Sequence, residues 1–216
     1  MSGVDVQMFI EDLQAAPVIA IVRGLRPDDV VRLGEALAEG GVRFLETTLN
    51  SPEPFVSIRR TAQRFADAGI HVGAGTVLAP EQVERVAHAG GTYVVSPGFH
   101  PAVVRRTKEL GLVSIPGFMT PSEGFAAADC GADLLKCFPA SALGPAYLKA
   151  IKAVLPHPVV AVGGVNVDTA ADYVGAGAVA VGVGSSIVDK QLIAEGRFGE
   201  LAELARRFLA AVRDAR

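Results

Sequence analysis

Eight short apolar runs alternate with helix-like stretches along the chain, and this repeat limits the possible folds more than any other feature of the sequence. Runs that are apolar throughout are typical of parallel strands covered on both faces, and helices between the strands supply that cover. Eight such units predict a closed (β/α)₈, or TIM, barrel, with an open doubly wound sheet as the alternative. The predicted strands are residues 18–22, 44–49, 71–74, 93–95, 113–115, 134–138, 159–162 and 178–183.

The intervening stretches carry residues that start and stop helices. Pro80 and Glu81 open one predicted helix, and Gly90 and Gly111 lie where helices are expected to end. No linker-like segment divides the chain, so one domain is predicted over residues 1–216, with an extra N-terminal helix over residues 4–15 that closes the barrel floor. The other clear helices are residues 28–39, 80–88, 101–110, 122–129, 147–154 and 198–212, with one more opening at Asn166.

The charge and the rare residue types argue against several functions. The net charge is −3 and no basic block is present, which disfavours a nucleic-acid partner or a polybasic membrane patch. Two cysteines and four scattered histidines fit neither a disulfide framework nor a zinc site, so no metal and no cofactor are predicted. No apolar run approaches the roughly 20 residues of a membrane span, and the first residues lack a secretory pattern. A cytoplasmic protein with a small-molecule ligand is expected.

Lys136 is the lysine whose position is least ordinary. It lies in the apolar run Leu-Leu-Lys-Cys-Phe at residues 134–138, whereas the other four lysines fall in helix or loop patterns. A buried amine must be paired or have a lowered pKa, and a lowered pKa is what an amine nucleophile requires near neutral pH. Lys136 is therefore a candidate Schiff-base residue. The alternative is a lysine that reaches solvent from an edge strand or pairs with a structural carboxylate.

Glu46 is the natural partner of Lys136 across a narrow barrel, because it lies inside the second predicted strand. A carboxyl group in a dry site tends to have a raised pKa, which suits the proton transfers of Schiff-base chemistry. A purely structural ion pair between the two side chains is the alternative.

The ends of the predicted strands supply candidate binding groups, because barrel enzymes gather function at the carboxyl ends of their strands. Gly163 and Gly164 follow the seventh strand, and Gly184 and Ser185 follow the eighth, where barrels often bind phosphate. These glycines could also serve only as tight turns. Arg23, after the first strand, is a candidate clamp for a carboxylate.

Two further side chains complete the candidate site. Thr76 follows a Gly-Ala-Gly turn and could donate to the same carboxylate as Arg23. Phe138 is expected to form an apolar wall beside the Lys136 amine, with plain core packing as the alternative.

Several motifs occur in an order that resembles the class I aldolases of 2-keto-3-deoxy-6-phosphogluconate and of its galactonate relative. The resemblance spans residues 17–210. It implies a (β/α)₈ barrel, a homotrimer, no metal, and cleavage of a phosphorylated keto-deoxy acid to pyruvate and glyceraldehyde 3-phosphate. The motifs are Val-Arg-Gly at 22–24, Leu-Glu-Thr-Thr-Leu-Asn-Ser-Pro at 45–52, Gly-Ala-Gly-Thr-Val-Leu at 73–78, Val-Ser-Pro-Gly at 95–98, Ile-Pro-Gly at 115–117, Leu-Lys-Cys-Phe-Pro-Ala at 135–140 and Val-Gly-Gly-Val at 162–165.

Position by position, the resemblance implies that Lys136 forms the Schiff base and that Glu46 is the acid and base. It also assigns Thr76 and Pro97 to the pyruvyl group, Phe138 to the imine, and Gly163, Gly164 and Ser185 to the phosphate.

The substrate prediction rests on one departure from the gluconate-type pattern. Those enzymes often carry an arginine where this chain has Asn50, and Arg23 can supply the missing cation. The segments 49–52 and 138–149 look more like the galactonate enzymes, so 2-dehydro-3-deoxy-6-phosphogalactonate is the predicted substrate. Its gluconate epimer and 4-hydroxy-2-oxoglutarate are alternatives. A phosphate-binding isomerase with Glu46 as its base, and a non-catalytic sugar-phosphate binder, are more distant ones.

Overall fold

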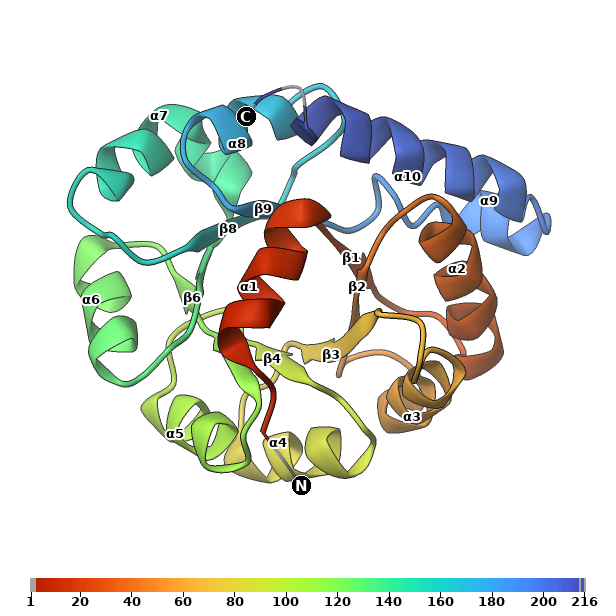
Figure 1. Ribbon diagram of the computed structural model, residues 1–216, viewed down its shortest axis with the longest axis horizontal. Coiled ribbons are helices and arrows are strands. Elements are labelled where there is room, and N and C mark those ends of the chain that lie inside the picture. Colours follow the sequence, from red (N-terminus) through yellow and green to blue (C-terminus); the bar gives the residue numbers. More distant parts are fainter. Residues whose placement is uncertain (1–2, 214, 216) are drawn as a thin grey trace.

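The predicted apolar runs form a parallel sheet that curls into a barrel in the computed structural model, which describes residues 3–213 and 215 (Figure 1). Residues 1, 2, 214 and 216 of the predicted domain lie outside the described residues. The strands are β1 Val18–Val22, β2 Phe44–Thr48, β3 His71–Gly75, β4 Tyr93–Val95, β5 Val113–Ile115, β6 Gly117–Phe118, β7 Leu135–Cys137, β8 Val159–Val162 and β9 Ala180–Val183.

The β5 strand matches the fifth predicted strand, residues 113–115, and the short β6 strand that follows it was not predicted; Pro116 lies between the two. Proline has no N–H group to donate to a neighbouring strand, so the ladder is interrupted there. β5 pairs with β4 and β6 pairs with β7, while the Lys136 N–H donates to the Pro116 carbonyl at 2.9 Å. The two ends of the sheet order, β5 and β6, are thus one continuous segment of chain. This arrangement confirms the barrel and rules out the open doubly wound sheet.

Helices follow the strands and surround the barrel (Figure 1). Among the described residues no helix is both long and apolar enough to cross a membrane. The helices are α1 Val6–Ala15, α2 Pro27–Glu39, α3 Pro54–Arg64, α4 Pro80–His88, α5 Pro101–Glu109, α6 Pro121–Asp129, α7 Ala140–Lys152, α8 Ala170–Gly175, α9 Lys190–Ala194 and α10 Phe198–Arg213.

Four helices differ from the sequence prediction, and the five-residue α9 is one that was not predicted at all. The α3 helix was not predicted either, because it is largely polar and buries only Ser57, Ile58 and Thr61. The α7 helix begins at Ala140 rather than at residue 147. A kink at Gly144, where φ is 77°, interrupts the helical periodicity of the sequence, so the residues before it were not predicted to be helical. The α8 helix begins four residues after the predicted start, because the Asn166 side chain first caps a turn by accepting from the N–H groups of residues 168 and 169.

The N-terminal helix α1 lies across the centre of the barrel, as predicted (Figure 1). Its Phe9 side chain is fully buried, and the Phe9 ring centroid lies 5.1 Å from that of Phe44 and 5.4 Å from that of Tyr93. The Asp12 carboxylate lies 2.9 Å from Nε2 of His71. Phe44, His71 and Tyr93 each begin a strand, so α1 closes the amino-terminal end of the barrel. The opposite end stays open for a ligand.

Candidate active site

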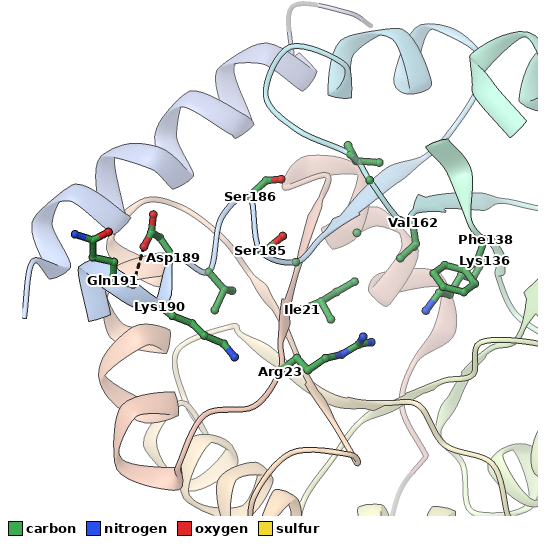
Figure 2. Close-up of a pocket in the computed structure, with 16 residues that line it drawn as sticks. Ile21, Arg23, Lys136, Phe138, Val162, Ser185, Ser186, Asp189, Lys190 and Gln191 are labelled. Atoms are coloured by element: carbon green, nitrogen blue, oxygen red, sulfur yellow. Dashed lines mark hydrogen bonds between the residues drawn. The ribbon is translucent and has the colours of Figure 1, made fainter. Parts of the chain in front are cut away.

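A cavity of about 630 Å³ opens at the carboxyl ends of β1, β7, β8 and β9 (Figure 2). Its apolar floor includes Ile21 and Val162, which are side chains of the barrel interior. The predicted site residues that line the cavity are Arg23, Lys136, Phe138, Gly163, Gly164, Gly184 and Ser185. The structure therefore brings together candidates that lie up to 162 positions apart in the sequence (185 − 23).

The Lys136 side chain is buried, with 5 % of its surface exposed, although its residue lines the cavity. Its Nζ atom lies 4.8 Å from the centroid of the Phe138 ring. Burial lowers the pKa of Lys136, Glu46 opposes that effect, and the positive charge of Arg23 adds to it. Because β7 lies between β6 and β8, an edge-strand lysine that reaches solvent is excluded. A lowered pKa leaves more of the amine neutral and able to attack a carbonyl carbon.

Glu46 is also buried, with 2 % of its surface exposed. Burial raises the pKa of its carboxyl group, and the nearby charges of Lys136 and Arg23 oppose the rise. Within the described part of the chain, Glu46 makes no ion pair within 4.0 Å, so a tight structural salt bridge with Lys136 is not present. A carboxyl group with a raised pKa can both release and take up a proton near neutral pH.

Gly75 provides the space that the Glu46 carboxyl group occupies. A Cβ atom at Gly75 would lie 1.8 Å from Oε1 of Glu46 and 2.6 Å from its carboxyl carbon. Such distances are far below van der Waals contact, so any side chain at this position must displace the carboxyl group. Thr76 follows directly with a left-handed φ of 59°, an uncommon conformation for a residue other than glycine.

We expect Gly75→Ala to lower kcat by about 10²-fold, because misplacing a catalytic group by about 1 Å costs that much. The measurement is the steady-state rate together with the melting temperature. Gly199→Ala is the matched control, since nothing lies within 4 Å of a Cβ atom at that position. A Gly75→Ala enzyme with full activity would show that Glu46 tolerates displacement.

Glu46, Thr76 and Pro97 are the predicted site residues that do not line the cavity itself. The turn after Thr76 is tied to the end of β4, because Oγ of Ser96 donates to the Val77 carbonyl at 2.7 Å. The Pro97 carbonyl oxygen lies 2.3 Å from where a Cβ atom of Gly117 would be, and Gly117 is in register with Lys136. The close approach of Pro97 to β6 therefore requires glycine at the position that pairs with Lys136.

The predicted phosphate loops occupy the side of the cavity formed by β8 and β9. Gly163 and Gly164 have φ values of 100° and 72°, which a residue with a side chain rarely adopts. A Cβ atom at Gly164 would lie 2.4 Å from Oγ of Ser141, so glycine is required there for space as well. Figure 2 shows Ser185 and Ser186 on the neighbouring loop. Backbone N–H groups and hydroxyl groups in such loops are suitable ligands for phosphate oxygens.

Lys190 begins α9 and lines the cavity, although its sequence surroundings had indicated only an ordinary helix or loop lysine. Its side chain points into the same cavity as that of Arg23 (Figure 2). Oδ1 of the adjacent Asp189 accepts from the N–H groups of Gln191 and Leu192 at 2.8 and 3.1 Å, and within the described residues Asp189 makes no ion pair with Lys190. The available signal was an Asp-Lys pair that begins four residues after Ser185 of the predicted phosphate loop. Arg23 and Lys190 thus place two cationic side chains in the cavity beside Lys136, which suits an anionic ligand.

Among the described residues, no cluster of three or more His, Cys, Asp or Glu side chains is placed to hold a metal ion. The family model for KDPG and KHG aldolases matches residues 9–204. The chain belongs to this aldolase family.

Individual relatives within and around the family agree with that assignment. The chain is 50 % identical over 173 residues to a probable 2-dehydro-3-deoxy-6-phosphogalactonate aldolase of Rhizobium meliloti, covering 79 % of this chain and 81 % of the relative. It is similar to a solved structure described as native KDPGal, with a TM-score of 0.86, 40 % identity, and coverage of 92 % of this chain and 95 % of the other.

A KDPG aldolase structure from Legionella pneumophila bears on the chemistry of the family. It matches with a TM-score of 0.84 and 31 % identity, covering 91 % of this chain and 96 % of that one. In that protein pyruvate was captured as a covalent carbinolamine intermediate. A carbinolamine is the adduct that a neutral amine forms with a keto acid.

Proposed function

We propose that this chain is a class I aldolase that cleaves 2-dehydro-3-deoxy-6-phosphogalactonate to pyruvate and D-glyceraldehyde 3-phosphate. The observation that carries the proposal is the buried Lys136 amine, which has a lowered pKa and lies at the base of a cavity with Arg23 and Lys190. Covalent catalysis requires the neutral amine, and a substrate with a carboxylate and a phosphate requires the surrounding cations.

Substrate binding uses the two ends of the cavity. The phosphate group is bound by the loops of Gly163, Gly164, Gly184 and Ser185, and Lys190 supplies a positive charge beside them. Arg23 holds the carboxylate next to Lys136. Between these ends the keto carbon lies against Phe138, whose ring faces the Lys136 amine.

The reaction begins when the neutral Lys136 amine attacks the C2 carbonyl carbon to form a carbinolamine. Glu46 in its protonated form donates to the departing hydroxyl group, water leaves, and a protonated imine and a Glu46 carboxylate remain. The carboxylate then accepts the proton of the C4 hydroxyl group. The electrons of the C3–C4 bond move to the imine nitrogen, which releases the aldehyde and leaves an enamine. Glu46 returns its proton to C3, and water hydrolyses the pyruvyl imine.

The galactonate configuration is supported by the names of the similar proteins, and the Legionella relative supports the gluconate epimer as the alternative. The test is kcat/KM for the two epimers, which differ at one stereocentre. We expect the galactonate epimer to be preferred by about 10-fold or more, the size of effect that one well-placed polar group produces. A preference for the gluconate epimer would overturn the configuration and leave the aldolase chemistry standing.

We expect Lys190→Met to lower kcat/KM for the phosphorylated substrate by about 10-fold, because a partly solvated charge-assisted contact to phosphate is lost. The effect should fall mainly on KM, since the phosphate group is remote from the breaking bond. The unphosphorylated substrate analogue should be affected much less. Lys149→Met is the control, because Lys149 is an exposed lysine of α7 outside the cavity. Equal losses for both substrates would contradict a phosphate-binding role for Lys190.

A homotrimer located in the cytoplasm completes the proposal. The trimer is supported by the resemblance to class I aldolases and by the exposed apolar side chains of Met119 and Phe125, of which 46 % and 42 % of the surface is accessible. Such side chains on one segment, β6 to α6, are often covered by a neighbouring subunit. Sedimentation equilibrium of the purified chain tests the assembly, and a monomer would contradict it.

A further inference from the structure

Tyr93 carries an unexplained polar group inside the barrel. It is the first residue of β4, it is fully buried, and its hydroxyl group has no hydrogen-bond partner among the described residues. An unpaired buried hydroxyl group is costly, so buried polar groups almost always have a protein or water partner. The proposed mechanism assigns no role to Tyr93.

The strand register places Tyr93 beside Glu46. Glu46 is in register with Gly73 on β3, and Gly73 is in register with Tyr93 on β4. Residues in register on neighbouring strands point to the same side of the sheet, so Glu46 and Tyr93 both point into the barrel. Gly73 between them has no side chain, and a Cβ atom there would lie 2.5 Å from the Tyr93 ring. The tyrosine ring thus fills the space that a side chain at position 73, between Tyr93 and Glu46, would occupy.

The Tyr93 ring packs against aromatic side chains of the N-terminal helix and of β2. Its centroid lies 5.4 Å from that of Phe9 and 6.4 Å from that of Phe44. Burial raises the pKa of Tyr93 well above its ordinary value, and the negative charge of Glu46 raises it further. The hydroxyl group therefore keeps its proton and can act as a hydrogen-bond donor to a carboxylate.

We propose that Tyr93 is a positioning residue for Glu46, with its hydroxyl group donating to the carboxyl group through a water molecule held between them inside the barrel. Such a bridge satisfies two buried polar groups at once and fixes the orientation of the carboxyl group. The consequence for catalysis rests on the proposed function, in which Glu46 transfers protons. The charged or titratable groups that influence Glu46 are Lys136 of β7, Arg23 after β1, and Tyr93 of β4.

The test compares wild-type enzyme with Tyr93→Phe, which keeps the ring and removes only the hydroxyl group. A donor to the carboxylate favours its charged form, so removing the donor raises the pKa of Glu46. We expect the Glu46 carboxyl group to titrate about half a pH unit or more higher in Tyr93→Phe, the size expected for a lost water-mediated hydrogen bond. Infrared difference spectroscopy of the free protein follows this titration, with Glu46→Gln to assign the band.

The acid limb of the kcat/KM profile should move to higher pH by the same amount. Tyr173→Phe, which alters a buried tyrosine of α8 outside the cavity, should move neither readout. An unchanged Glu46 titration in Tyr93→Phe would overturn the proposal. If the melting temperature of this variant also rose by about 2–4 °C, the wild-type hydroxyl group would be shown to be unpaired. The infrared titration does not require turnover. A shifted Glu46 band in Tyr93→Phe, together with a wild-type protein that does not cleave the substrate, would support the role of Tyr93 and contradict the proposed function.

Discussion

Replacing Lys136 with methionine is expected to lower kcat for aldol cleavage by at least about 10⁴-fold, because the nucleophile that forms the imine is lost. Methionine has a similar length and removes a buried charge, so the fold should be retained. We expect the melting temperature to be no lower than that of the wild type, because burial already disfavours the charged form of this lysine. Rate assays with either epimeric substrate and a thermal melt provide the measurement.

The matched control for this substitution is Lys149→Met, which changes an exposed lysine of α7 in the same way. It should leave the rate of cleavage unchanged. A Lys136→Met enzyme that still cleaved substrate at an appreciable rate would exclude covalent catalysis by this residue. It would favour an enzyme in which Lys136 acts only through its charge.

Replacing Glu46 with glutamine should lower kcat by about 10²- to 10⁴-fold, the usual contribution of a general acid or base. Glutamine keeps the shape of the side chain and cannot carry the proton between the hydroxyl groups and C3. Pyruvate should still form a reducible adduct with Lys136 in Glu46→Gln, but more slowly, because dehydration of the carbinolamine loses its acid. Glu203→Gln, on the exposed face of α10, is the control. A Glu46→Gln enzyme with a wild-type kcat would remove Glu46 from the mechanism.

The pH dependence of stability follows from the raised pKa of Glu46. The folded state binds this proton more tightly than the unfolded chain does, so the group makes folding less favourable as the pH rises above the ordinary glutamate value. Glu46→Gln removes this cost, and it should therefore melt at an equal or higher temperature than the wild type at neutral pH. The difference should vanish in acid, where the wild-type carboxyl group is protonated in both states.

The sequence was sufficient to predict the barrel and the residues at the ends of its strands. Each strand is buried on both faces, so its apolar character is continuous, and an included charge such as Lys136 is conspicuous. Arg23 and the glycines after β8 were predictable for a related reason, since βα turns follow the strands directly in the chain. Gly144 shows the limit of the pattern, because a kink inside α7 interrupts helical periodicity without ending the helix.

Other features depend on how distant segments meet, which a single sequence does not encode locally. Lys190 has ordinary sequence surroundings for a surface lysine, and only closure of the barrel brings it into the cavity with Arg23. The relation of Tyr93 to Glu46 depends on the register of three strands and on the absent side chain of Gly73. The break at Pro116 likewise alters the pairing of the fifth strand and leaves the barrel closed.

Borohydride reduction in the presence of pyruvate tests the central assignment most directly. Reduction converts an imine between pyruvate and a lysine into a stable secondary amine, which peptide mass spectrometry locates in the sequence. The account predicts one pyruvyl adduct, on the peptide that contains Lys136, and none in Lys136→Met. Active protein in which Lys136 remained unmodified, or in which the adduct formed on Lys190 instead, would contradict it.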